Sequence, residues 1–296
     1  MKRIAIFKTN IQQQNQADEV FITLTSILPS SRINFDLEDS DKILRIEDPD
    51  VDPDIIISVV QGLGFLCKSM PDKICKDPTN SADEMRTFWD SSFIEHEAMW
   101  GFQATNSAIL AKDLFLGKDI KDILVPGIGY GRNAQVFMEN NIKVTGIEIS
   151  QAAIALAREH YSPDLEILHG SVTDMPFNDH LYDGIFCYGL VYLLNPDQRK
   201  KMINDCFNQL KPGGWMVFSV ISVNSPNYGK GRKVRKDTFE VGKGAQVFFY
   251  DTNAVREEFG NYGLLDFFEI DEQTNAATHK PSFRFIIIKC KKEVEF

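Results

Sequence analysis

The apolar residues of the first 70 positions change between strand-like and helix-like spacing. Residues 3–9 alternate apolar and polar side chains, which predicts a half-buried strand, whereas the next apolar stretch has helical spacing up to Pro29. By the same criteria the predicted strands are 3–9, 32–39, 42–48 and 65–68, and the predicted helices are 15–28 and Pro53 to Gly62 or Gly64. The order is strand-helix-strand-strand-helix-strand, which predicts a small α+β domain over residues 1–70.

Later in the chain, short apolar strands and helical stretches alternate regularly. Residues 71–83 separate the two patterns and have the proline and small polar composition of a linker. The predicted strands are 122–126, 143–149, 165–170, 182–189, 213–220, 264–271 and 283–290, and the predicted helices are 132–140, 151–161, 196–210 and 254–263. Such alternation predicts an α/β domain over residues 84–296, with a mostly parallel sheet covered on both faces.

Composition narrows the class of protein. Apolar residues make up 43% of the 296 residues, which is ordinary for a globular chain, and the formal net charge of −10 argues against a broad nucleic-acid-binding face. No apolar run is long enough for a bilayer span, and the first residues lack a secretory signal pattern. Five cysteines, an odd number, suit reduced thiols. We expect a cytoplasmic protein that binds neither nucleic acid nor membrane.

The stretch ILVPGIGYGRNA, residues 123–134, carries three alternating glycines directly after a predicted strand. Gly127, Gly129 and Gly131 permit positive φ and present no Cβ to a ligand, so we expect the bare backbone to lie under a cofactor. A dinucleotide pyrophosphate favours G-x-G-x-x-G, whereas this loop has G-x-G-x-G. Seventeen residues past Gly131, Glu148 ends the next strand, where its carboxylate can accept hydrogen bonds from both ribose hydroxyls.

Three further segments accompany the glycine loop. Ser150 suits the N-cap of the helix at 151–161, and the acidic loop 171–176 follows the third strand and can bind an adenine amino group. Tyr188 lies at the end of the fourth strand, and LKPGG at 210–214 suits a helix end and a tight turn before the fifth strand.

These segments together resemble class I methyltransferases that use S-adenosylmethionine, over about residues 83–290. The V-P-G start of the loop resembles the small-molecule and thiopurine-type branch. The resemblance implies a Rossmann-like seven-stranded sheet in the order 3-2-1-4-5-7-6 with an antiparallel last strand, and S-adenosylhomocysteine as product. It places the glycines at the methionine, Glu148 at the ribose, Asp174 at the adenine amino group, Ile149 and Val172 beside the ring, and Tyr188 at the methyl group. Many members carry an acidic residue where this chain has Val125.

The first domain is ferredoxin-like and resembles heavy-metal-associated domains, but the loop at 9–14 lacks their two cysteines. Cys67 and Cys75 are eight residues apart, which is not a metal-clamp spacing. We therefore expect no metal site there, and a scaffold or homodimer contact instead.

The acceptor side has two candidate regions. Trp89 and Trp100, in the segment before the first strand, pack as an ordinary aromatic helix face or close over the donor. The candidate catalytic residues are His96 and Tyr188, and His96 is either a base or part of a solvated surface cluster. Tyr192, at the fourth strand, is a further candidate for substrate contact. Near residues 222–251 the candidates are Tyr228 and Tyr250, with the cations Lys230, Arg232, Lys233, Arg235, Lys236 and Lys243. A basic cover suits an anionic small molecule, although the simple solvation of an exposed hairpin explains the charges too.

Methyl transfer from a sulfonium needs alignment more than a shared catalytic residue. The leading hypothesis is therefore methyl transfer to a small molecule at O, N, S or C. Two alternatives stay open: a metalloid methyltransferase of the arsenite type, because Cys187 lies near the predicted donor site, and a non-catalytic protein that binds S-adenosylmethionine.

Overall fold

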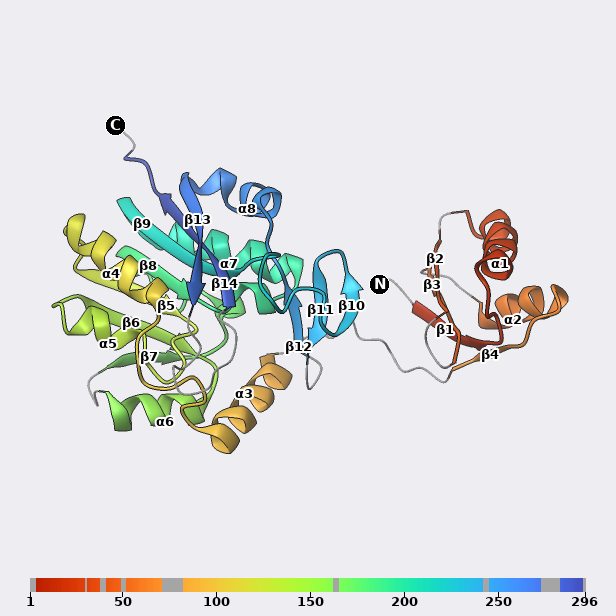
Figure 1. Cartoon of the computed structure of the whole chain (residues 1–296), viewed down its shortest axis with the longest axis horizontal. Helices are drawn as coiled ribbons and strands as arrows, with labels where there is room; N and C mark the ends of the chain where they lie inside the picture. The colour runs from red at the N-terminus through yellow and green to blue at the C-terminus, as the bar shows by residue number, and fades with distance from the viewer. Residues whose placement is uncertain are drawn as a thin grey trace. The chain divides into compact units, whose positions relative to one another are not determined.

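The chain divides into two compact units, Met1–Thr79 and Asn80–Phe296 (Figure 1). The computed structural model describes residues 4–29, 31–37, 41–48, 52–70, 82–161, 165–241, 245–272 and 283–294. The predicted linker, 71–83, lies almost wholly outside these ranges.

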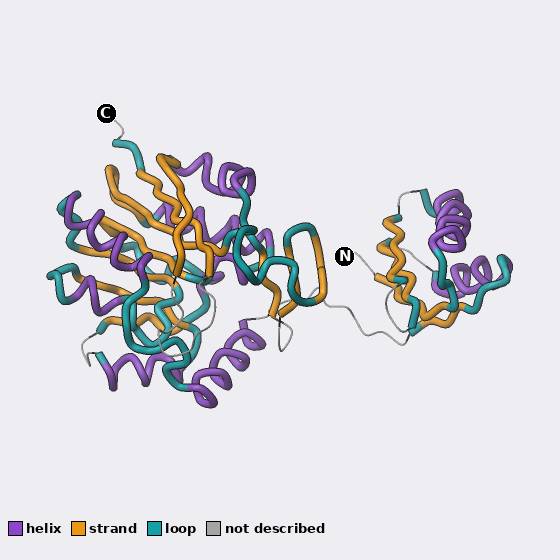
Figure 2. Tube along the Cα trace, in the orientation of Figure 1, coloured by secondary structure: helices purple, strands orange, loops and turns teal. Residues whose placement is uncertain are grey.

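The N-terminal unit is a four-stranded antiparallel sheet with two helices on one face (Figure 2). Its elements are β1 Ile4–Thr9, α1 Gln14–Ile27, β2 Arg32–Asp36, β3 Ile43–Glu47, α2 Pro53–Gly62 and β4 Cys67–Ser69. The chain order strand-helix-strand-strand-helix-strand expected from the sequence is confirmed. The spatial order of the strands is β2-β3-β1-β4. Phe7 of β1 packs in one core with Leu24 of α1 and Val60 of α2, which explains the helical spacing of the apolar residues.

The second unit contains a seven-stranded sheet in the order β13-β14-β9-β8-β5-β6-β7. Its strands are β5 Asp122–Pro126, β6 Lys143–Glu148, β7 Glu166–His169, β8 Tyr182–Tyr188, β9 Leu210–Ile221, β13 Leu264–Glu272 and β14 Phe283–Lys291. Strands β7, β6, β5, β8 and β9 are parallel, and β14 runs antiparallel to both of its neighbours. The expected order 3-2-1-4-5-7-6 with an antiparallel last strand is therefore confirmed.

Helices cover both faces of this sheet (Figure 1). Helices α4 Asn106–Gly117 and α5 Ala134–Met138 share one apolar core with Ala157 of α6 Gln151–His160. Helices α7 Pro196–Asn208 and α8 Thr252–Phe259 belong to the other core. Among the described residues, no helix has the length and the apolar content that a bilayer crossing requires.

Two local expectations need correction. Residues 210–214 are part of β9, where the pairing with β8 shifts, instead of a helix end and turn. Leu210 pairs with Tyr182 and Trp215 with Gly184, and Gly213 takes positive φ within this offset. The stretch 222–251, for which a simple exposed hairpin was one reading, contains a three-stranded antiparallel sheet of β10 Arg232–Arg235, β11 Thr238–Val241 and β12 Ala245–Phe248.

Candidate active site

The glycine loop connects β5 to α5, and all three glycines have positive φ. A Cβ at Gly127 would come within 2.6 Å of Leu190, and one at Gly131 within 3.2 Å of Tyr161, so these two positions are held small by neighbouring side chains. A Cβ at Gly129 would meet only the Phe93 ring, at 3.9 Å. The backbone at Gly129 is therefore the part of the loop that faces open space, as a close approach to a ligand requires.

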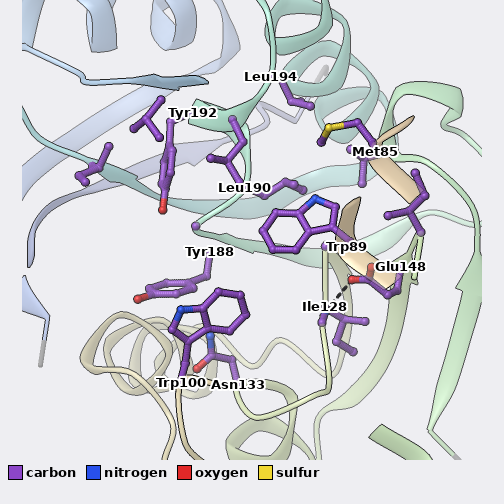
Figure 3. Close-up of a pocket in the computed structure, with 18 of the residues that line it drawn as sticks. Met85, Trp89, Trp100, Ile128, Asn133, Glu148, Tyr188, Leu190, Tyr192 and Leu194 are labelled. Carbon is purple, nitrogen blue, oxygen red and sulfur yellow. Dashed lines mark hydrogen bonds between the residues drawn. The ribbon is translucent and has the colours of Figure 1, made fainter. Parts of the chain in front are cut away.

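Glu148, at the end of β6, lies beside this loop and is only 6% exposed. Its two carboxylate oxygens accept hydrogen bonds from the Gly129 amide at 2.8 Å and the Ser150 amide at 2.9 Å. Figure 3 shows the Glu148 side chain at the cavity. Burial raises the pKa of Glu148, while these amide bonds act in the opposite direction. The carboxylate thus links the glycine loop to the N-terminus of α6.

A cavity of about 810 Å³ opens at the carboxyl ends of β5, β6 and β8. The sequence-predicted residues that line it are Trp89, Trp100, Gly127, Gly129, Glu148, Ile149, Val172, Tyr188 and Tyr192. A position beyond the carboxyl ends of parallel strands is where open α/β sheets bind ligands. The cavity is therefore the candidate site for both the cofactor and its acceptor.

The segment before β5 covers part of the cavity. Trp89 and Phe93 lie on α3 Ala82–His96, and their ring centroids are 6.0 Å apart. Trp100 follows the helix and stacks on Tyr130 of the glycine loop, with the ring centroids 6.3 Å apart and the planes within 8°. The side chains of Trp89 and Trp100 project into the cavity (Figure 3). They are the only tryptophans among its lining residues.

Asp90 of α3 attaches this helix to α6, a role that the sequence did not reveal. Its carboxylate accepts hydrogen bonds from the Ser150 hydroxyl at 2.6 Å and the Ala152 amide at 3.2 Å. Ser150 in turn caps α6 by accepting from the Ala153 amide at 3.1 Å. Asp90 and Ser150 are sixty residues apart in the chain, so no local pattern could pair them.

Arg132 is a second residue that sequence reasoning missed as a site residue. It follows Gly131, lines the cavity, and donates from Nη1 to the Trp100 carbonyl oxygen at 2.6 Å. Its guanidinium carbon lies 5.8 Å from the centroid of the Tyr188 ring. The only available signal was its position directly after the last glycine of the loop.

Tyr188 and Tyr192 line the cavity beyond the glycine loop. The Tyr188 ring stacks on Phe285 at 5.4 Å, and the Tyr192 ring lies edge-on to Phe285 at 6.1 Å. Burial raises the pKa of both phenols above the ordinary value of 10.0. Both side chains are therefore neutral near pH 7 and can donate a hydrogen bond or pack against an acceptor.

Several predicted site residues lie outside the cavity lining. Asp174 is exposed, whereas Ser171 and Thr173 of the same loop line the cavity. His96 is exposed, with Nε2 3.6 Å from a Glu95 carboxylate oxygen. Gly131 faces Tyr161, as described above.

The two tyrosines predicted near 222–251 also lie outside the lining. The exposed Tyr228 donates a hydrogen bond to Asp237, and the fully buried Tyr250 donates one to Glu258 at 2.6 Å. Both phenols are thus paired with acidic side chains.

The cysteines give the metalloid alternative no support. Cys187 is fully buried, and burial raises the pKa of its thiol to about 12. Cys67 belongs to the N-terminal unit, and Cys75 lies outside the described residues. Within the described ranges, no three His, Cys, Asp or Glu side chains form a group that could hold a metal ion.

Part of the cavity wall is apolar and includes residues of the three-stranded sheet. Its residues are Ile221, Val241, Val247, Phe249, Phe283 and Phe285. Lys230 lines this cavity, whereas Arg232 pairs with Glu240 and Arg235 donates to Gln246 at 3.3 Å. Lys233 and Lys236 are exposed, and Lys243 lies outside the described residues. Lys230 is therefore the only lysine of the basic stretch that lines the cavity in the described part of the chain.

The strand order and the antiparallel β14 are those of the class I S-adenosylmethionine-dependent methyltransferase fold, and the cavity lies at the glycine loop of that fold. Residues 123–214 match the family described as a methyltransferase domain.

Curated relatives agree on the class and differ in acceptor. A protein of Mycolicibacterium smegmatis named for S-adenosylmethionine-dependent methyl transfer is 28% identical over 121 residues, covering 41% of this chain and 45% of the relative. The tRNA N(3)-methylcytidine methyltransferase Mettl2 of Drosophila melanogaster is 25% identical over 212 residues, covering 60% of this chain and 61% of that protein. The chain thus spans less than two thirds of the length of either relative.

Among solved structures, the fold resembles the 1,6-didemethyltoxoflavin-N1-methyltransferase of Burkholderia thailandensis, crystallised with that compound and S-adenosylhomocysteine. The TM-score is 0.58 at 16% identity, and the match covers 77% of this chain and 95% of that one. At this identity the likeness concerns the fold.

Proposed function

We propose that the protein transfers a methyl group from S-adenosylmethionine to a small-molecule acceptor by in-line displacement. The observation that carries the proposal is the open backbone at Gly129 beside the buried carboxylate of Glu148, at the carboxyl ends of neighbouring parallel strands. When bound, S-adenosylmethionine supplies an activated methyl group. Glu148 would accept from its ribose hydroxyls, Ile149 and Val172 would flank the adenine, and the glycine loop would support the methionine part.

The adenine amino group is better matched by Ser171 and Thr173 than by Asp174, because both hydroxyls lie at the cavity. Their oxygen atoms are 2.7 Å apart, and the Ser171 hydroxyl also accepts from the Thr173 amide at 3.2 Å. When Ser171 donates to Thr173, each oxygen keeps one lone pair for a ligand. The aromatic side chains on the acceptor side would align the acceptor and exclude water.

S-adenosylhomocysteine is expected to raise the melting temperature of the full chain. A ligand that binds only the folded state stabilises it by mass action, about 2.7 kcal/mol at 100 times Kd. Differential scanning calorimetry over a ligand titration measures the shift, and adenine alone is the control. An unchanged melting temperature at millimolar S-adenosylhomocysteine would contradict the donor site. Stoichiometric formation of S-adenosylhomocysteine from S-adenosylmethionine with any acceptor would exclude the non-catalytic alternative.

For the acceptor we propose a small apolar molecule with an anionic group, as in the small-molecule and thiopurine-type branch. The apolar walls suit its body, and Lys230 suits its charge. RNA is the second candidate class, because the matched relatives include tRNA methyltransferases. Methyl incorporation into total tRNA, but not into aromatic acids, would favour that class.

Lys230→Gln is expected to remove the preference for an anionic ligand. With S-adenosylhomocysteine bound, the wild type should bind 1-naphthoate about 3- to 10-fold more tightly than 1-naphthamide, since an exposed lysine contributes about 1 kcal/mol. The variant should bind the two equally in isothermal calorimetry. Lys233→Gln, outside the cavity lining, is the matched control. Equal binding of both compounds by the wild type would argue against an anionic acceptor.

For the N-terminal unit we propose a scaffold or homodimer contact. Its helix and strand order is that of ferredoxin-like domains, and the loop at 9–14 offers no thiolate to a metal.

A further inference from the structure

We infer that Arg132 binds the carboxylate of the donor's amino-acid part, so that it selects the complete cofactor over adenosine fragments. This inference rests on the proposed function, since it assigns one end of the same donor site. It adds a charged contact that the glycine loop and Glu148 do not supply.

The position of Arg132 follows from the loop geometry. Glu148 marks the ribose end of the donor site, and the loop runs from there past Gly129 to Arg132. Arg132 lines the cavity near Tyr188, which ends β8 on the other side of β5 from β6. The amino-acid part of a donor whose ribose contacts Glu148 would extend over Gly129 toward this guanidinium.

The guanidinium is held in place before a ligand arrives. Its Nη1 donates to the Trp100 carbonyl oxygen at 2.6 Å, and its carbon lies over the Tyr188 ring. A guanidinium carries five N–H donors in a planar fork, so donors remain for a carboxylate. The fixed orientation reduces the entropy lost when the ligand binds.

The carboxylates near Arg132 already accept hydrogen bonds from backbone amides. The Glu272 carboxylate interacts electrostatically with Arg132. It already accepts hydrogen bonds from the Asn106 and Ser107 amides at 3.0 and 2.7 Å. Each carboxylate oxygen of Glu148 likewise accepts one hydrogen bond from a backbone amide. In the described part of the chain, no ion pair involves Arg132. A ligand carboxylate would therefore gain a charge-assisted bond without displacing a protein partner.

The test compares three ligands of the same nucleoside: S-adenosylhomocysteine, its decarboxylated analogue, and 5′-methylthioadenosine. Arg132→Gln should weaken S-adenosylhomocysteine binding by about 10- to 100-fold in isothermal calorimetry, the range for a hydrogen bond to a charged group. Binding of the two ligands without a carboxylate should change less than about 2-fold on the same scale. Arg256→Gln removes a guanidinium 5.5 Å from the Phe267 ring, outside the cavity lining, and is the matched control.

The other outcomes of this test distinguish a failure of the inference from a failure of the proposed function. Parallel weakening of all three ligands would overturn the inference, because a structural role of Arg132 does not depend on the ligand's carboxylate. If Arg132→Gln fails to fold, Arg132→Lys keeps the charge but loses the fork, and it should show a smaller loss confined to S-adenosylhomocysteine. Absence of S-adenosylhomocysteine binding in the wild type would instead sink the proposed function.

Discussion

Gly129→Val is expected to abolish S-adenosylhomocysteine binding while leaving the protein folded. Gly129 has φ of +59°, and a side chain there costs roughly 1–2 kcal/mol in backbone strain. The only atom near its Cβ position is a Phe93 ring carbon at 3.9 Å, so the isopropyl group can be accommodated by projecting into the cavity. There it would occupy the space that the ligand needs, and we expect affinity to fall at least about 100-fold, or about 2.7 kcal/mol.

Isothermal calorimetry and melting curves of the variant separate binding from folding. Gly229→Val is the matched control, because Gly229 also has positive φ, +77°, has nothing within 4 Å of its Cβ position and does not line the cavity. The control should lose a similar amount of stability and keep its donor affinity. Undiminished affinity in Gly129→Val would mean that the bare backbone there does not contact the cofactor.

Glu148→Gln is expected to weaken donor binding by about 10- to 100-fold, the range of 1.5–3 kcal/mol for hydrogen bonds to a charged group. Glutamine keeps one oxygen for the Gly129 or Ser150 amide, so the fold should survive. Glu148→Ala would leave both amides without their acceptor and should lower stability as well. Glu139→Gln, at an exposed carboxylate on α5's C-cap, is the control.

A comparison of two nucleosides, with and without the ribose hydroxyls, tests whether Glu148 contacts the ribose. Wild-type protein should bind 5′-methylthioadenosine more tightly than its 2′,3′-dideoxy analogue, and Glu148→Gln should bind the two with similar affinity. If the wild type does not distinguish the two compounds, Glu148 does not hold the ribose.

The same carboxylate makes donor binding depend on pH. Burial raises the pKa of Glu148 above its ordinary value of 4.5, so the free folded protein favours the neutral acid relative to the unfolded chain. That contribution to stability is complete below pH 4.5 and is lost as the pH rises through the folded-state pKa. Ribose hydroxyls need the charged acceptor, so donor affinity should increase over the same rise, and calorimetry at a series of pH values measures it. Glu148→Gln should remove this dependence.

Local patterns in the sequence were sufficient for the chain order of the strands in the four-stranded and seven-stranded sheets, but they did not predict α4 or the strands β10, β11 and β12. Period-two spacing identified the strands of these two sheets, and helical spacing identified the helices that pack on them. Both spacings arise because the apolar side chains of one element face the same core. Ser150 was recognised as a helix cap from its immediate neighbours, and it does cap α6. The alternating glycines indicated positive φ, which all three have.

The sequence did not show which residues of a segment line the cavity. In the loop 171–176, Asp174 is exposed, whereas Ser171 and Thr173 line the cavity. The backbone path of a short turn decides which neighbour faces inward, and single-sequence patterns do not specify that path. In the same way, the basic stretch was evident from the sequence, but of its cations among the residues described only Lys230 lines the cavity.

The sequence by itself determined the chain order of the strands in the two larger sheets and the glycine loop that follows β5, because propensity, periodicity and turn chemistry act between near neighbours. Only the tertiary structure decided that Asp90 holds α3 against α6, that Trp100 covers Tyr130, and that Arg132 lies between Trp100 and Tyr188. These contacts join residues about thirty to sixty positions apart, and packing of whole elements against the sheet brings them together.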